Sequence, residues 1–445
     1  MEKKWEELSS DEKQETMFQR WLSPQGVRFA SPAAEKAYQE RVTRIKDAIQ
    51  LKKVPDRVPV FLMAGFFPAY YSGITPREAM YDYEKLYVAW KKYMLDFEPD
   101  AHNGAAGPGP GKLFEVLDYK LYNWPGHGIS PDHPYQCLEG EYVRADEYDA
   151  LIQDPSDFFR RVYLPRVFGS FEPFRKLPPL TNILELPITG GSFAPYGLPE
   201  VQAALTNLLE AGREAQRWAG FIGKWHDEMV ATGFPAFAGG FTKAPFDTIG
   251  DTLRGTRGIM MDMYRQPDKL LEALEAITPL MIKMGVAGAR ANGNPIVVIP
   301  LHKGADGFLS DKQFRTFYWP TFRKLLIGLI DEGCVPYSYA EGGYSSRLEI
   351  IRDLPGGKAV WAFDQTDMAR AKKVLGDTAC IGGNLPITLL SVGTPQQVKD
   401  FARRLIDTAG KDGGYIMVNG AVIDEARPEN IHAMIDFTRK YGVYK

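Results

Sequence analysis

Apolar runs alternate with amphipathic helical patterns through the second half of the chain. Each run is short and continuously apolar, which is typical of parallel strands buried on both faces. Each is followed by a stretch in which apolar residues recur about every 3.6 positions, the period of a helix packed on one face. Five such units in a row predict an α/β protein, either a (β/α)₈ barrel or an open, doubly wound sheet. The five strands are expected at Ile296–Pro300, Val335–Tyr339, Ala359–Phe363, Ala379–Gly382 and Tyr415–Val418.

The alternation begins before this region and defines the organisation of the chain. An apolar run at Val58–Met63 precedes a predicted helix over 76–95, with Thr75 as its N-cap. Residues 1–53 predict two helices, which we interpret as an N-terminal helical extension, and the barrel is expected to span 54–445. The helices after the five later strands are expected at 311–332, 345–353, 368–375, 395–409 and 428–441.

Two features favour the closed (β/α)₈ TIM barrel over the open sheet. No GxGxxG or GxxxxGK[ST] motif follows a predicted strand, so the phosphate-binding turn of nucleotide-binding open sheets is absent. Polar residues gather instead just after the strand ends, where the loops of a barrel converge on the active site. These residues are His302, Asp306, Glu341, Asp364, Asp367 and Asn384.

A stretch from about 103 to 180 interrupts the strand and helix pattern. It is rich in Gly, Pro and aromatic residues and includes the sequences GAAGPGPG and WPGHGISPDHPYQ. We interpret it as a long insertion after an early strand. Long insertions of this kind usually cover or line a functional site.

Composition removes several classes of protein. The 445 residues carry 53 Lys and Arg against 56 Asp and Glu, so the chain lacks the basic charge that nucleic-acid binding requires. The three cysteines are odd in number and share no CxxC spacing, which argues against a disulfide framework and a Cys-rich zinc site. A reducing cytoplasm is the location that fits best. The N-terminal segment is charged, and no run of about 18 apolar residues occurs. We therefore expect neither a signal peptide nor a membrane-spanning segment.

Three residues at the predicted rim are candidates for catalysis. His302 lies two residues after a strand and is suited to act as a general acid or a ligand, or else as a polar residue that closes the top of the barrel. Glu341 follows the next strand, where a buried carboxylate must be paired, metal-bound or protonated. Asp364 ends the strand after that. His302 and Glu341 would also be two ligands of a metal ion, such as zinc, if one is bound.

Further polar residues are candidates for substrate binding. Asp306 and Asn384 follow strands but also suit tight turns. Asp100 and His102 lie at the expected end of the second strand, and Tyr339 lies near the end of a later one. The predicted substrate-binding set is therefore Asp100, His102, Asp306, Tyr339 and Asn384.

Several segments, taken in order, resemble the uroporphyrinogen decarboxylase superfamily over about two-thirds of the chain. They are Asp56–Val60, Leu301–Phe308, Gly382–Pro386, Gly393–Pro395, Pro428–Ile431 and Tyr441–Tyr444. The resemblance implies a (β/α)₈ barrel, often dimeric, with its active site at the carboxyl-terminal mouth. It does not settle the reaction, because the superfamily contains both decarboxylases and methyltransferases.

Departures from two branches of the superfamily narrow the choice. The decarboxylases resemble one another in an arginine-rich segment near the first strand, which anchors a tetrapyrrole with many carboxylates. Here the segment is Met63–Tyr71, which has no basic residue. The thiol-methylating branch holds zinc with a His-x-Cys motif and a late Cys, but Tyr339–Gly342 and Gly420–Ala421 lack these ligands. Neither reaction is therefore expected.

A third branch is more similar, and its members pass a methyl group from a small methylated compound to a corrinoid partner protein. The resemblance thus implies a methyltransferase in which His302 and Glu341 activate the leaving oxygen or nitrogen. Asp364, Asn384 and Asp100 would orient the substrate. The corrinoid (cobalamin) would belong to the partner, with zinc or no tightly bound cofactor in this chain.

Two alternatives stay open from the sequence. The first is a carboxy-lyase acting on a tetrapyrrole or a smaller carboxylate, which needs at least two arginines at the mouth. The candidates are Arg57, Arg254, Arg257 and Arg347. The second is a non-catalytic protein that binds a corrinoid or a tetrapyrrole, which would have an apolar mouth without converging carboxylate and imidazole groups.

Overall fold

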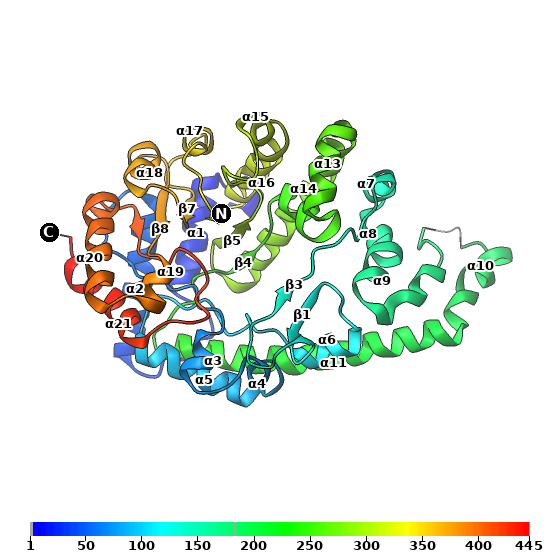
Figure 1. The fold of residues 1–445 in the computed structure, drawn as a ribbon, viewed down its shortest axis with the longest axis horizontal. Coiled ribbons are helices and arrows are strands. Elements are labelled where there is room, and N and C mark those ends of the chain that lie inside the picture. The colour runs from blue at the N-terminus through cyan, green and yellow to red at the C-terminus, as the bar shows by residue number, and fades with distance from the viewer. Residues whose placement is uncertain (1–2, 182–183, 445) are drawn as a thin grey trace.

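The computed structural model describes residues 3–181 and 184–444 (Figure 1). In it, eight parallel strand segments pair into a closed ring. Six of them pair in the order β4-β5-β6-β7-β8-β9. Two shorter segments complete the ring, because Val60 pairs with Met417, Phe61 with Ala101 and His102 with Ala236, all in parallel. The predicted (β/α)₈ barrel is therefore confirmed. The longer strands are β4 (Gly240–Phe241), β5 (Ile296–Leu301), β6 (Val335–Ala340), β7 (Val360–Phe363), β8 (Cys380–Gly383) and β9 (Tyr415–Ile416).

The five strands predicted in the second half are confirmed, each within two residues of its expected bounds. β5 and β6 pair over their whole lengths, from Ile296 opposite Val335 to Leu301 opposite Ala340. Every residue of β6 is buried, as expected for a strand with helices outside it and the barrel core inside it. The loops that follow β5 and β6 consequently start side by side.

The helices around the ring begin where the sequence supplies a cap. The Asp367 carboxylate accepts the backbone N–H groups of Ala369 and Arg370, and Thr394 and Gln397 form a capping box. The outer helices include α12 (Pro245–Thr248), α13 (Gly255–Arg265), α14 (Pro267–Asn292), α16 (Trp319–Asp331), α17 (Leu348–Ile351), α18 (Met368–Leu375), α19 (Ile387–Val392), α20 (Pro395–Leu405) and α21 (Pro428–Tyr441).

The single helix expected over 76–95 is two helices, α4 (Pro76–Tyr81) and α5 (Tyr83–Phe97). Asp82 separates them because its backbone is extended and its side chain accepts the N–H of Lys85 as a new N-cap. The apolar pattern continues through this residue, so it did not reveal the break.

Two N-terminal helices, α1 (Ser10–Leu22) and α2 (Pro32–Gln50), cover the amino-terminal end of the barrel. Their apolar side chains pack against the first residues of β5, β6, β7 and β8 in one buried cluster. Each large apolar side chain buried there contributes roughly 1.5–3 kcal/mol to folding. The extension therefore covers the amino-terminal end of the barrel and leaves the carboxyl-terminal end uncovered by these two helices.

The irregular region after the second strand continues past residue 180 to the start of α11 (Pro199–Ala231). It contains a small sheet in the order β2-β1-β3 and several short helices. Its elements are α6 (Gly111–Leu117), β1 (Tyr122–Pro125), β2 (Gly128–Ile129), β3 (Gln136–Cys137), α7 (Tyr148–Gln153), α8 (Pro155–Phe158), α9 (Leu164–Val167) and α10 (Leu186–Phe193). In Figure 1 the first part of α11 extends beyond the barrel toward α10. In the part of the chain that is described, every helix is too short or too polar to cross a bilayer.

Candidate functional site

An imidazole held between two carboxylates marks the carboxyl-terminal mouth of the barrel. His302 follows β5 directly, and its Nδ1 lies 2.6 Å from Oδ2 of Asp251. Its Nε2 lies 3.7 Å from Oε1 of Glu341, which follows β6. The pairing of β5 with β6 brings His302 and Glu341 together, as the sequence predicted. Asp251 comes from the π-helical turn η6 (Ile249–Leu253), which continues α12.

The electrostatics of this group favour a protonated imidazole. Burial alone would lower the pKa of His302, but the hydrogen bond and charge of Asp251, with the charge of Glu341, raise it above its ordinary value. Burial also raises the pKa of Glu341, and the neighbouring His302 offsets only part of that effect. A histidine with a raised pKa is suited to donate a proton near neutral pH.

Asp251 is the common partner of three cationic or titratable groups. Lys243 Nζ lies 2.5 Å from its Oδ2, and Lys303 Nζ lies 3.1 Å from its Oδ1. Burial acts to raise the pKa of Asp251, but the bond from His302 and the charge of Lys243 outweigh it and hold the pKa well below its usual range. Asp251 is therefore an ionised anchor for His302.

A second carboxylate fixes the backbone beneath the imidazole. Asp247 is fully buried, and it accepts the backbone N–H groups of Lys303 at 2.9 Å and His302 at 3.3 Å. The hydroxyl of Tyr318 donates to the same carboxylate at 2.7 Å. Burial and the charge of Asp251 raise the pKa of Asp247 to about 6. These contacts hold the start of the loop after β5 in one position.

The sequence reasoning missed Lys243, Asp247 and Asp251. The strand that precedes them, β4, has only two residues. The surrounding sequence Gly-Gly-Phe-Thr-Lys has no apolar run from which this strand could be predicted. The signal that could have found them is the spacing of four residues between Asp247 and Asp251, which places two carboxylates on one face of a helix.

Three predicted residues lie on the rim and tie its loops together. Asp364 Oδ2 accepts the backbone N–H of Gly342 at 3.1 Å, and Asn384 donates from Nδ2 to the Thr366 carbonyl at 2.8 Å. Asp306 accepts from the Ser346 hydroxyl at 2.9 Å and from its backbone N–H at 3.1 Å. Their roles toward a substrate stay predictions.

Tyr339 is buried inside the barrel, below the rim. Its hydroxyl donates to the Gly420 carbonyl at 2.7 Å, so it links β6 to the loop after β9. Burial raises the pKa of this phenol above its ordinary value, and the group stays protonated. Its role toward a substrate also stays a prediction.

Asp100 and His102 do not join the group at the mouth. His102 is buried against α11, with its ring centroid 4.9 Å from that of Trp225 and 5.3 Å from that of His226. Asp100 lies at the amino-terminal end of its strand, where Arg44 of α2 donates to it at 2.8 Å and Arg57 at 2.7 Å. We correct both expectations of substrate binding, because these side chains are committed to packing and ion pairs elsewhere.

Replacing Asp100 with asparagine is expected to lower the free energy of unfolding by about 3 kcal/mol, because Arg44 and Arg57 lose a fully buried partner. Urea denaturation followed by circular dichroism measures the change. Asp377→Asn is the matched control, since its pair with Arg352 is largely exposed and contributes less than about 1 kcal/mol. Equal midpoints for the two variants would contradict the structural role of Asp100.

The insertion lies against η6, the helical turn that carries Asp251. The backbone N–H of Val143 donates to the Leu253 carbonyl at 2.7 Å, and Arg254 donates to the Val143 carbonyl at 2.6 Å. Burial raises the pKa of the Cys137 thiol on β3, and the nearby charge of Asp251 adds to that effect. The prediction that the insertion lies beside the site agrees with these contacts.

The donor set does not fit a bound zinc ion. Glu341 Oε1 and His302 Nε2 offer only two ligands. Among the described residues, no group of three or more His, Cys, Asp or Glu side chains is placed to hold a metal ion. A zinc site needs three or four such ligands.

Most arginines considered for a carboxylate substrate already have partners. Arg57 pairs with Asp100 at the opposite end of the barrel. Arg254 is buried, and its Nε lies 2.6 Å from Asp262 Oδ2. Arg347 is buried too, and its Nε lies 3.6 Å from Asp306 Oδ1. Arg257 is exposed on α13. Among the described residues, three of these four arginines therefore already have carboxylate partners, and the fourth is exposed on an outer helix.

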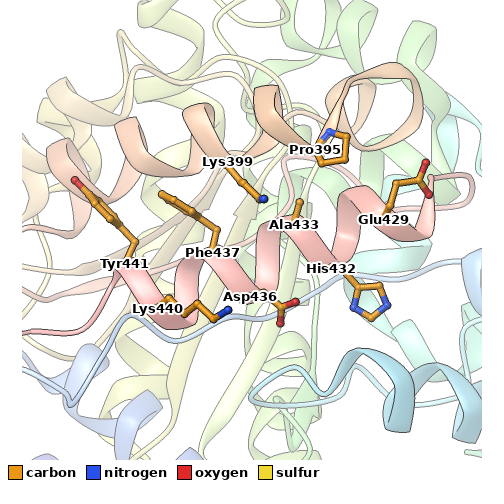
Figure 2. A pocket seen from close by; sticks show the side chains of 9 residues that line it. All are labelled: Pro395, Lys399, Glu429, His432, Ala433, Asp436, Phe437, Lys440 and Tyr441. Carbon is orange, nitrogen blue, oxygen red and sulfur yellow. The ribbon is translucent and has the colours of Figure 1, made fainter.

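A surface groove lies on the outer helices, away from these residues. It has a volume of about 700 Å³ and runs between α20 and α21 (Figure 2). The residues that line it are Pro395, Lys399, Glu429, His432, Ala433, Asp436, Phe437, Lys440 and Tyr441. None of the predicted site residues is among them.

Comparisons with known proteins bear on the family and the fold. Residues 233–441 match the family model described as Uroporphyrinogen decarboxylase (URO-D). The uroporphyrinogen decarboxylase of Syntrophotalea carbinolica is 26% identical over 197 residues, which cover 44% of this chain and 56% of that enzyme. That of Chlorobaculum parvum is 24% identical over 248 residues, which cover 54% of this chain and 67% of that enzyme. The chain thus spans only about half to two-thirds of these relatives.

One solved structure extends the likeness to almost the whole chain. A methyltransferase from Methanosarcina mazei superposes with a TM-score of 0.59 over 91% of this chain and 98% of that chain, at 15% identity. At that identity the likeness shows the fold. Residues 233–441 therefore match the uroporphyrinogen decarboxylase family model, as the sequence motifs implied, and the chain has a (β/α)₈ barrel fold.

Proposed function

We propose that this protein is a methyltransferase that takes a methyl group from a small O- or N-methylated compound and delivers it to a corrinoid on a partner protein. The observation that carries the proposal is the imidazole of His302, held between Asp251 and Glu341 with a raised pKa. An alkoxide or amide anion is too basic to leave unaided, so demethylation needs a proton donor at the heteroatom.

Three residues of this chain would position and transfer the proton. Asp251 orients the imidazolium through Nδ1, which leaves the Nε2 proton directed toward the mouth and Glu341. The bond between the methyl carbon and the heteroatom breaks with its electron pair on the heteroatom, which takes the proton from Nε2. The methyl group passes to the reduced corrinoid, which supplies the new bonding pair. Glu341 then serves to return a proton to His302.

Decarboxylation of a polycarboxylate tetrapyrrole has less support. Such a substrate is best held by paired arginine contacts. Arg57, Arg254 and Arg347 are committed to Asp100, Asp262 and Asp306. Lys243 and Lys303, the lysines at the mouth, both form ion pairs with Asp251.

A purely binding role also has less support. An apolar mouth without titratable groups would suit it, whereas imidazole, carboxylate and ammonium groups converge here. Titratable groups with shifted pKa values that cluster in this way are often part of functional sites.

The direct test uses purified full-length protein, free cob(I)alamin as the acceptor, and three classes of donor: a methoxylated benzene, a methylamine and a quaternary methylammonium compound. Loss of the cob(I)alamin absorption in the presence of one donor is the expected result. No methylation with any donor, together with carbon dioxide release from uroporphyrinogen, would overturn the proposal in favour of decarboxylation.

Replacing Glu341 with glutamine is expected to lower turnover by roughly 10- to 100-fold, since the amide cannot carry the proton that His302 needs. The fold should be retained because the Glu341 side chain is partly exposed. Initial rates with the active donor measure the effect. The control is Glu349→Gln, which removes an exposed carboxylate on α17 and should leave the rate unchanged. Wild-type turnover in Glu341→Gln would rule out this role.

A further inference from the structure

A buried histidine lies where the second strand segment of the ring meets the long helix α11. The ring of His102 lies edge-on to two rings of that helix, at 78° to Trp225 and 81° to His226. The centroids of the two imidazole rings are 5.3 Å apart. His102 and His226 therefore form part of the contact between the barrel and α11.

The hydrogen bonding of His102 requires its neutral form. The backbone N–H of Gly104 donates to Nδ1 at 3.1 Å, so Nδ1 carries no proton and the single ring proton lies on Nε2. Nε2 is buried and has no hydrogen-bond partner among the described residues. An imidazolium carries a proton on both nitrogens, and its Nδ1–H would face the N–H of Gly104. His102 therefore cannot take up a proton without breaking this contact.

The second imidazole adds to this effect. Burial lowers the pKa of His102 well below its ordinary value, and the charge of His226 lowers it further. Burial also lowers the pKa of His226, and the charge of Asp227 offsets part of that effect. Two positive charges this close repel each other strongly when little water separates them. The closed contact therefore favours two neutral rings.

The other charged groups on the packed elements have partners of their own. On α11, Glu228 pairs with Lys91 of α5 at 2.7 Å, and Lys224 lies over an aromatic ring of α5. On the strand, Asp100 is bound by two arginines. The loop between α11 and β4 contains no charged residue. Asp227 is thus the carboxylate that acts on the pair, through His226.

The same helix supports the insertion. The first half of α11 packs on α6 and on the 3₁₀ segment η4 (Gly169–Lys176) in a separate apolar cluster. In Figure 1 the helix runs from the barrel to the far end of the insertion. A change in the contact between α11 and the barrel would therefore reach the base of the insertion.

We propose that His102 and His226 make the contact between α11 and the barrel sensitive to pH, so that α11 loosens when the pair takes up protons. Once the contact opens, both rings regain the ordinary histidine pKa of about 6.5 and bind protons more readily than in the closed form. The closed contact consequently loses stability as the pH falls below that value. At pH 5, opening is favoured by roughly 30-fold for each histidine that stays neutral in the closed form.

Hydrogen–deuterium exchange of the full chain, followed by mass spectrometry, tests the proposal at about pH 7.5 and pH 5 after correction for the intrinsic exchange rate at each pH. Peptides from residues 214–231 of wild-type α11 are expected to lose protection by roughly 30-fold or more at pH 5. Peptides of α14, which contains no histidine, are the internal reference and should keep their protection.

Three variants separate the two histidines from general effects of acid. His102→Asn is expected to remove most of the loss, because the asparagine oxygen can accept the N–H of Gly104 but does not titrate. His226→Gln should reduce the loss without abolishing it. The control is His133→Gln, which replaces an exposed histidine of the insertion and should keep the wild-type loss.

Three results would overturn the proposal. They are equal protection of wild-type α11 at both pH values, an equal loss in α14, and a full wild-type loss in His102→Asn. If His102→Asn already lacks protection of α11 at pH 7.5, His226→Gln decides, and a loss equal to that of the wild type contradicts the proposal. No methyl donor enters these measurements, so their outcome is independent of the proposed reaction.

Discussion

Replacing His302 with glutamine is expected to lower the rate of methyl transfer by about 10²- to 10⁴-fold, the range found when a general acid is removed. Glutamine can still bond to Asp251 but cannot carry a proton to the leaving heteroatom. Single-turnover rates with the active donor and free cob(I)alamin measure the loss. His133→Gln changes an exposed histidine of the insertion and should behave as wild type.

The effect should depend on the donor, which gives the experiment a second readout. A quaternary ammonium donor releases a neutral amine and needs no proton. A methoxylated benzene releases a basic oxygen and does need one. A loss confined to the donor with the more basic leaving group is therefore expected. Equal activity of His302→Gln and wild type on every donor would remove His302 from the chemistry.

Asp251→Asn is expected to reduce the rate near neutral pH by on the order of 10²-fold and to move the pH profile. Asp251 raises the pKa of His302, while burial acts to lower it. A general acid works only when protonated, so wild-type activity should fall as pH rises through the raised pKa. Without Asp251 the pKa of His302 falls, and activity should be lost at a lower pH.

Rates measured from about pH 5 to 9, with the His302 resonances followed by NMR, test this prediction. The matched control is Asp353→Asn, which removes an exposed carboxylate whose partner is Arg323. An unshifted alkaline limb in Asp251→Asn would contradict the assignment. Circular dichroism is needed as well, because Lys243 and Lys303 both lose their partner.

The sequence was most informative where strands are long. β5 to β8 were predictable because each is a continuous apolar run, and residues after them, such as His302 and Glu341, were correctly placed together. The region around β4 was not predictable, because ring closure there depends on a few backbone pairs in a glycine-rich segment. Asp247 and Asp251 follow that segment and were missed with it.

Asp100 shows a different limit. A polar residue beside a short strand can lie at either end of the barrel, and the apolar pattern does not say which. Only the pairing of Val60 with the backbone of Asp100 fixes it at the end covered by α2. The partners of Asp100, Arg44 and Arg57, are separated from it by 56 and 43 positions, so no local motif connects them.

The ring of strands joins parts of the chain that are made far apart in time. Met63 bonds to Asn419 across 356 positions, and α1 and α2 pack on strands as late as β9. At about 5–20 residues per second, a ribosome needs roughly 20–70 s to cover that distance. Until β9 is made the ring of strands cannot close. The packing of α1 and α2 on the barrel is therefore completed only after nearly the whole chain has been synthesised.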